Sequence, residues 1–138
     1  MAQHEVRPAR IEDLVGAAWR DGDVPVAPEL LERTLTTSHE VWAGFIGGEL
    51  ACVYGIEMPS VCLPAHLWVV TTEVVERHWV TFLRQSRLMI DRSATRFGPL
   101  ETWCRSGYQK SDNWLRWLGF KKIDEIEVRG LTMLRYKK

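Results

Sequence analysis

Two adjacent glycines between apolar runs limit how this chain can fold more than any other feature of its sequence. Residues 41–46 and 50–56 are rich in β-branched and aromatic side chains, and Gly47, Gly48 and Glu49 separate them. Glycine adopts the positive φ angles that tight hairpin turns require, and runs of this composition favour strands. The sequence therefore predicts two antiparallel strands joined by a glycine turn.

The rest of the chain alternates between strand-like and helix-like stretches. Over residues 73–97 apolar side chains recur about every 3.6 residues, with arginines largely between them, and Gly98-Pro99 ends the pattern. The same reasoning predicts strands at residues 4–9, 67–71 and 100–104, helices at 11–19, 28–36 and 111–119, and a final hairpin of residues 120–129 and 131–136. This order predicts an α/β fold with a mixed central sheet.

Length and composition indicate one domain spanning residues 1–138. The longest stretch without a charged residue, 58–72, is too short for a membrane span, and the N-terminus lacks the layout of a signal peptide. A cytoplasmic protein is expected. Three widely spaced cysteines without a Cys-x-x-Cys pair predict neither a disulfide framework nor a zinc site, and no metal site is expected.

Charge is divided unevenly along the chain. Residues 1–73 carry 4 Arg and 11 acidic side chains, and residues 74–138 carry 14 Lys plus Arg and 7 acidic ones. The net charges of the two halves are therefore −7 and +7. This division fits an anionic partner for the basic half, self-association of unlike faces, or two sets of charges that mix once the chain folds.

Three features together resemble the GNAT (Gcn5-related N-acetyltransferase) fold over nearly the whole chain. They are the order of the elements, the glycine hairpin, and the C-terminal pattern Ser111-x-x-x-x-Arg116-Trp-Leu-Gly-Phe120. The resemblance implies an α/β fold in which helices flank a mixed sheet. It also implies a site for acetyl-CoA, although two parts of that site differ here.

The first difference is in the C-terminal helix. Counting back from Phe120, Tyr108 stands where the family has an asparagine and Ser111 matches its small residue. Leu115 replaces the tyrosine that often protonates the coenzyme A thiolate. Because leucine has no ionisable proton, a general acid would have to come from elsewhere, and Tyr108 is the only tyrosine nearby.

The second difference is in the loop that holds the diphosphate of the cofactor. The family places glycines at a helix N-terminus there, because a Cβ would block the approach of the phosphates. Here the corresponding residues are 71–79, and no glycine occurs between Gly55 and Gly98. Whether the chain is an enzyme is therefore left open by its sequence.

One subgroup of this fold resembles the chain in both respects, the GNAT-like internal virion proteins of short-tailed, podovirus-type phages. The matching stretches are Val6-Arg-Pro-Ala9, Trp68-Val-Val-Thr-Thr72, and Leu115 at the tyrosine position. The resemblance implies a catalytically inactive protein that binds phage structural or core proteins during virion assembly. It would need no cofactor and would lie in the host cytoplasm or the virion.

Two alternatives remain. In an active acetyl-CoA-dependent N-acyltransferase, Glu57 or Glu73 would be the general base and Tyr108 the general acid. The residues around the cofactor would then be Val69, Val70, Val75, Arg77 and Ser111. The other alternative is an adaptor that binds nucleic acid through its basic C-terminal half.

Overall fold

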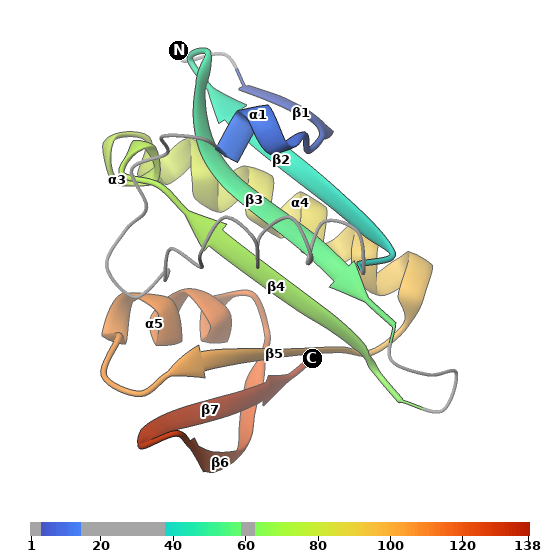
Figure 1. The fold of residues 1–138 in the computed structure, drawn as a ribbon, viewed down its shortest axis with the longest axis vertical. Coiled ribbons are helices and arrows are strands. Elements are labelled where there is room, and N and C mark those ends of the chain that lie inside the picture. Colours follow the sequence, from blue (N-terminus) through green and yellow to red (C-terminus); the bar gives the residue numbers. More distant parts are fainter. Residues whose placement is uncertain (1–3, 15–37, 59–62) are drawn as a thin grey trace.

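The computed structural model describes residues 4–14, 38–58 and 63–138 (Figure 1). These residues form one sheet of seven strands in the order β1-β2-β3-β4-β5-β7-β6. The strands are β1 His4–Pro8, β2 Glu40–Ile46, β3 Glu49–Glu57, β4 Ala65–Thr71, β5 Leu100–Arg105, β6 Lys121–Val128 and β7 Leu131–Lys137. The helices are α1 Ile11–Leu14, α3 Val74–Arg77, α4 Trp79–Phe97 and α5 Gln109–Trp117. The mixed α/β sheet flanked by helices is thus confirmed.

The glycine hairpin is also confirmed. Gly47 and Gly48 have φ angles of 61° and 82°, and β2 and β3 pair antiparallel on either side of them. The final hairpin turns in the same way at Arg129 and Gly130, whose φ angles are 50° and 79°. The predicted helix at residues 28–36 and the second half of the one at 11–19 lie outside the described residues.

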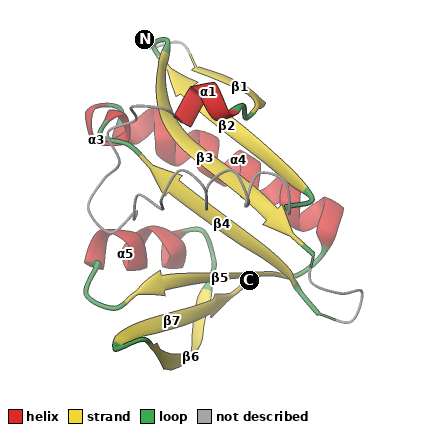
Figure 2. Ribbon diagram, in the orientation of Figure 1, coloured by secondary structure: helices red, strands yellow, loops and turns green. Residues whose placement is uncertain are grey.

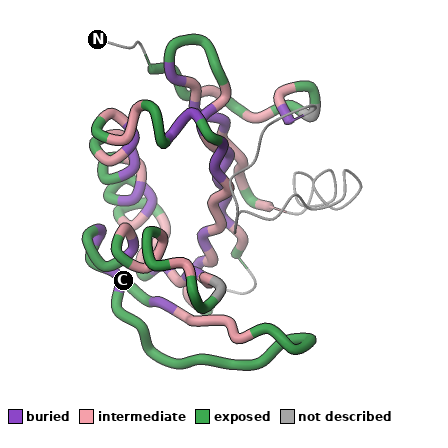
Figure 3. Tube along the Cα trace, turned by 90° about the vertical axis from the view of Figure 1, so that its left-hand side faces the viewer, coloured by how far each residue is buried: buried purple, intermediate pink, exposed green. Residues whose placement is uncertain are grey.

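Helices α4 and α5 cover one face of the sheet and α1 lies on the other (Figure 3). Alternate residues of β2 show the division, because Ala43 packs with Leu14 of α1 whereas Ile46 packs with Phe82 of α4. The largest core cluster lies under α4 and α5 and includes Tyr136 of β7, which is fully buried. In the described part of the chain, no helix has the length and apolar character needed to cross a membrane.

The prediction of one continuous helix over residues 73–97 is wrong in one detail. The segment breaks at His78, whose φ and ψ angles of −129° and 44° are not helical, so that α3 and α4 are separate. Both Val74 and Val75 are buried, against Ile46 and Ala51. Successive residues of a straight helix point about 100° apart. The break separates the short α3, which carries both buried valines, from α4, which crosses the sheet.

Gly55 of β3 provides a test of how closely this sheet is packed. It lies directly opposite Trp68 of β4, and a Cβ at Gly55 would come within 2.5 Å of the Trp68 ring. The indole is held there by a hydrogen bond from its Nε1 to Ser38 Oγ, 3.0 Å long. We expect Gly55→Ala to lower the free energy of unfolding by about 1–3 kcal/mol, because the ring must shift. Urea unfolding measures this loss.

The matched control is the same substitution in a Trp68→Leu background, where no indole meets the new methyl group. There the cost of Gly55→Ala should fall to a few tenths of a kcal/mol, or about the intrinsic strand effect. An equal cost in both backgrounds would contradict the close approach of ring and backbone.

Candidate functional site

The parallel strands β4 and β5 separate soon after they begin. Only two residue pairs join them, Ala65 with Leu100 and His66 with Glu101. Beyond these pairs β4 stays bonded to β3, and β5 is bonded to β7 (Figure 2). The two strands therefore form a V that opens toward their carboxyl ends, which is where open α/β sheets bind ligands.

The open end of the V is covered by the first turns of α4 and α5. A cavity of about 30 Å³ remains inside, which we call the inner cavity. Its lining residues are Val69 and Thr71 of β4, Trp79 and Phe82 of α4, and Lys110, Ser111 and Trp114 of α5. A water molecule needs roughly 10–15 Å³ of such space. The inner cavity therefore has room for one or two waters and not for a larger ligand.

Three aromatic rings close the inner cavity, and we call them the aromatic wall. The ring of Phe82 lies between those of Trp79 and Trp114, with centroid distances of 5.7 and 5.5 Å. Trp114 Nε1 also donates a hydrogen bond of 3.1 Å to Ser86 Oγ, whose hydroxyl donates to the carbonyl of Leu83. Each ring pair contributes about 0.5–1.5 kcal/mol beyond its buried area, so the wall holds α5 against α4.

A larger groove of about 600 Å³ lies on the far side of this wall, between α4 and α5. It shares Trp79, Lys110 and Trp114 with the inner cavity, so these side chains lie between the two spaces. Lys110 is largely exposed, with its Nζ 3.8 Å from Glu76 Oε1. The outer groove thus combines three indole rings, those of Trp79, Trp114 and Trp117, with a cation that could meet an anionic ligand.

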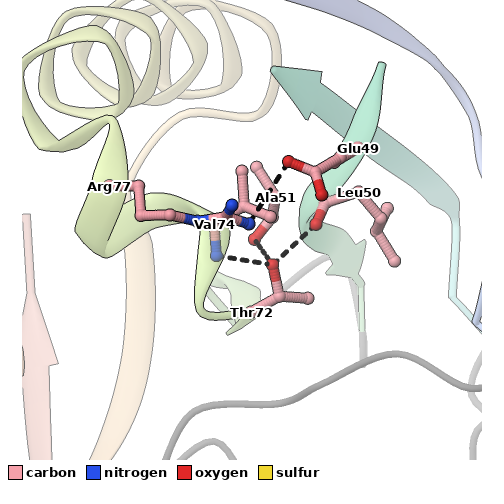
Figure 4. A network of polar contacts seen from close by, with 6 residues as sticks. All are labelled: Glu49, Leu50, Ala51, Thr72, Val74 and Arg77. Carbon is pink, nitrogen blue, oxygen red and sulfur yellow. Dashed lines mark hydrogen bonds and ion pairs between the residues drawn. The ribbon is translucent and has the colours of Figure 1, made fainter. Parts of the chain in front are cut away.

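The turn between β4 and α3 is bonded within the chain (Figure 4). The hydroxyl of Thr72 donates to the carbonyl of Leu50 at 2.6 Å and accepts from the backbone N–H of Val74 at 3.3 Å. The N–H of Val75 donates to the Thr72 carbonyl, and that of Glu76 to the Glu73 carbonyl. These amides are the ones that a glycine loop would offer to a diphosphate, and here a phosphate would have to displace their partners.

The predicted cofactor residues fall in different places. Val69 and Ser111 line the inner cavity. Val70 lies on the opposite face of β4 and packs with the cluster under α1. Val75 is fully buried between α3 and β3, and Arg77 is mostly exposed with its guanidinium 3.2 Å from Glu49 Oε2. The structure therefore brings two of the five to the V.

The predicted acid and base residues are also spread out. Glu57 of β3 lies at the closed end of the V, where its Oε2 is 3.5 Å from His66 Nδ1 of β4. Thr71, at the open end, is five residues further along β4 than His66, or about 17 Å away. Glu73 is exposed at the N-cap of α3, and Tyr108 is half-buried at the N-cap of α5. Both follow strands that lead to the open end.

The sequence did not indicate that Lys110 lies between the inner cavity and the outer groove, nor that the two tryptophans of α5 differ. Trp114 belongs to the aromatic wall, whereas Trp117 is 44% exposed and is stacked under the guanidinium of Arg87 at 3.9 Å. Leu115 is buried in the main core cluster, so the position of the family's tyrosine is occupied by a packing side chain. Residue spacing on α5 could not separate the two tryptophans, because positions three apart share a face.

A partly buried hydrogen bond joins α5 to β7 of the sheet. The hydroxyl of Tyr136 in β7 donates to Asp112 of α5, and Arg116 Nε donates to the same carboxylate at 3.0 Å. The bond from Tyr136 holds the pKa of Asp112 below its usual value, while burial raises the pKa of Tyr136. Removing this bond should therefore loosen α5 in a way that depends on pH.

We expect Tyr136→Phe to lower the free energy of unfolding by about 1–2 kcal/mol at neutral pH, because a charged acceptor loses its donor. A carboxylate whose pKa is lowered by folding stabilises the protein above its unfolded pKa of about 3.9, and that stabilisation is lost as the pH falls through the folded value. The difference between the two proteins should therefore shrink below about pH 4.

Tyr54→Phe is the matched control for that measurement. Tyr54 is also buried, but among the described residues its hydroxyl has no hydrogen-bond partner. Its substitution should cost little at any pH. Denaturant unfolding of both variants between pH 3 and 7 measures the effect, and a Tyr136→Phe cost that is the same at every pH would contradict the bond to ionised Asp112.

No protein-family model matches the sequence, and no curated protein matches it. Solved structures, in contrast, match it over almost its whole length. The ribosomal-protein-S18-alanine N-acetyltransferase from Escherichia coli aligns with 98% of this chain and 92% of its own, at 8% identity and a TM-score of 0.75. The ribosomal-protein-alanine N-acetyltransferase from Brucella melitensis aligns over 97% and 98%, at 17% identity and a TM-score of 0.68.

A third neighbour is a ribosomal L7/L12 alpha-N-protein acetyltransferase in complex with coenzyme A. It aligns with 99% of this chain and 93% of its own, at 13% identity and a TM-score of 0.68. These neighbours are acetyltransferases, and nothing links the chain to phage particles. The hypothesis of an inactive virion-assembly protein is therefore wrong. The chain has the fold of the GNAT N-acetyltransferases.

Proposed function

We propose that the chain is an acetyl-CoA-dependent N-acyltransferase whose acyl donor is taken up at the V between β4 and β5. The observation that carries the proposal is the separation of these strands after two residue pairs, which leaves a gap at the carboxyl ends of a parallel pair. The likeness to acetyltransferases over almost the whole chain, one of them a coenzyme A complex, supports the same assignment.

The residues present fit one part of acetyl-CoA better than another. The outer groove of about 600 Å³ is within the range of small-molecule sites, and Lys110 supplies a cation at its edge. The turn after β4 does not fit the diphosphate in the manner of a glycine loop, because its amides are already bonded. Lys110 is therefore assigned the contact with phosphate, and weak binding is expected.

The acetyl thioester would supply the acyl group, and the chain would supply access and proton transfer. Because the inner cavity is too small for a thioester, Trp114 has to move before any acyl group can lie between β4 and β5. Glu73 and Tyr108, which follow strands toward the open end, remain the candidates for base and acid. Glu57, the last residue of β3, lies beside His66 at the closed end of the V, so we assign it no part in proton transfer.

The proposal is tested by binding and transfer together. Calorimetry should detect acetyl-CoA, and mass spectrometry should find an acetyl group on amine acceptors such as N-terminal peptides. Lys110→Gln should weaken acetyl-CoA binding about three- to tenfold, because an exposed cation contributes modestly. Lys121→Gln, the same change at an exposed residue of β6, is the control and should leave binding unchanged. The assignment would be refuted if the chain neither bound acetyl-CoA at millimolar concentration nor transferred an acetyl group to any acceptor.

A separate prediction concerns the aromatic wall. Trp114→Leu removes the ring contact with Phe82 and the bond to Ser86, which together oppose opening by about 1.5–2 kcal/mol. Acetyl-CoA affinity should therefore rise about tenfold, while the free energy of unfolding falls by about 1–3 kcal/mol.

Trp117→Leu is the control for that variant, since Trp117 borders the outer groove but is not part of the aromatic wall. Its affinity for acetyl-CoA should not rise. An affinity that drops in Trp114→Leu would show instead that the indole is part of the binding surface.

A further inference from the structure

A second groove lies on the same face of the sheet, on the other flank of α4. It has a volume of about 580 Å³ and is formed by β1, β2 and β3 on one side and by α4 on the other. It shares no lining residue with the inner cavity or the outer groove. We call it the α4 flank groove. A space of this size falls within the range of small-molecule sites, so its chemistry is worth considering by itself.

The register of the sheet and the pitch of α4 bring its walls together. Trp42 of β2 and Tyr54 of β3 are directly opposite each other, and both side chains lie on the face that α4 covers. Gln85, Met89 and Arg92 recur at intervals of four and three residues, so they lie along one flank of α4. The strands thus supply aromatic walls, and the helix supplies polar groups at its edge.

Three hydrogen-bonding groups in this groove are unused. Among the described residues, the Tyr54 hydroxyl, the Gln85 carboxamide and the Arg92 guanidinium have no hydrogen-bond or ion-pair partner. Tyr54 is 8% exposed, and its hydroxyl, like the exposed Arg92 and the half-buried Gln85, meets the solvent of the groove. A ligand in the groove could therefore take up these donors in place of water.

The two carboxylates that line the groove are already paired, Glu40 with Arg96 and Asp91 with Lys138. Glu40 accepts from Arg96 at 3.0 Å and from the indole Nε1 of Trp42 at 3.1 Å. The unused groups can all donate, and Arg92 carries an unbalanced positive charge. They match a ligand that brings negative oxygen acceptors, because charge-assisted bonds from a guanidinium are the strong ones.

An apolar recess of about 40 Å³ continues from the groove. It shares Val6, Tyr54, Gln85 and Met89 with the groove and is lined almost wholly by apolar atoms. Gly44 contributes to its floor, where the lack of a side chain leaves the space open. A ligand bound by the donors would therefore have an apolar portion beside its anionic group.

We propose that the α4 flank groove binds a small organic carboxylate with an aryl or short alkyl body. Its carboxylate accepts hydrogen bonds from Arg92, Gln85 and Tyr54. Its apolar body packs against Trp42 and Met89 and extends toward the recess. The site is separate from the V, and the proposal does not depend on the chain being an acyltransferase.

Phenylacetate is a suitable probe, with its neutral analogue phenylacetamide as the matched ligand. In nitrogen-15 spectra of the intact chain, phenylacetate should shift the indole N–H signal of Trp42 and the side-chain amide signals of Gln85 in a saturable way. Phenylacetamide should bind at least about tenfold more weakly, because it lacks the charge that pairs with Arg92. Saturating coenzyme A should not compete with phenylacetate.

Three variants complete the test. Arg92→Gln should weaken phenylacetate binding about tenfold, whereas Arg84→Gln, an exposed arginine of the same helix outside the groove, should not change it. Tyr54→Phe should weaken binding about two- to tenfold and leave the unfolding midpoint unchanged, because the hydroxyl has no partner in the protein.

Several results would overturn the proposal. They are a shift that does not saturate at millimolar phenylacetate, equal affinity for phenylacetamide, equal weakening by Arg84→Gln and Arg92→Gln, or shifts confined to Trp79 and Trp114 of the aromatic wall. The last result would place the ligand at the V instead. The unfolding midpoint of Tyr54→Phe shows that this variant is folded, so its loss of phenylacetate binding cannot be mistaken for unfolding.

Discussion

The short pairing of β4 with β5 is the constraint on which the rest of this structure depends. Two residue pairs hold the strands together at one end, and Leu100 and Ala65 of these pairs are both buried in the main core cluster. Toward the other end the strands diverge: β3 pairs with the outer edge of β4 and β7 with the outer edge of β5, so the inner edges that face each other across the V pair with no other strand. The gap between them must then be filled by side chains from the helices or by a ligand.

In this chain the helices fill the gap. Phe82 of α4 and Trp114 of α5 meet over the V, and Tyr136 holds α5 in place through Asp112. Closing the V buries aromatic surface and so stabilises the fold, but the same contacts must be given up when a ligand enters. Such opposition between stability and binding is common where a site needs space that packing would otherwise occupy.

The parts of the fold that follow from local chemistry could be predicted from the sequence. The glycine hairpin needs only the φ preference of Gly47 and Gly48, and the strands on either side follow from their composition. The break at His78 could not be predicted, because the apolar period of the sequence continues through it and the packing of Val74 and Val75 against β3 is a contact between distant segments. The V is equally nonlocal, since it depends on where β7 returns to the sheet.

The candidate site was predictable to the same limited degree. Ser111 and Val69 were found through the resemblance and line the inner cavity, but Val70 faces the other side of β4 because strand residues alternate. The acidic first half and the basic second half of the sequence also do not form two separate charged surfaces in the folded chain, because ion pairs join them. Arg77 pairs with Glu49 and Arg96 with Glu40, which joins acidic residues of the first half to basic ones of the second.

Helix α4 links the V to the second groove through one turn. Phe82 lines both the inner cavity and the apolar recess, and Ser86, which lines the recess, accepts the hydrogen bond of Trp114. A movement of Trp114 that opens the V therefore removes the hydrogen bond that Ser86 Oγ accepts, although Ser86 still donates to the Leu83 carbonyl, and it alters the packing of Phe82. Because close-packed side chains cannot shift independently, the recess must change shape with the wall. Any free energy of coupling between the two spaces must act equally in both directions, and it differs from competition for one site, because the groove and the inner cavity share no lining residue.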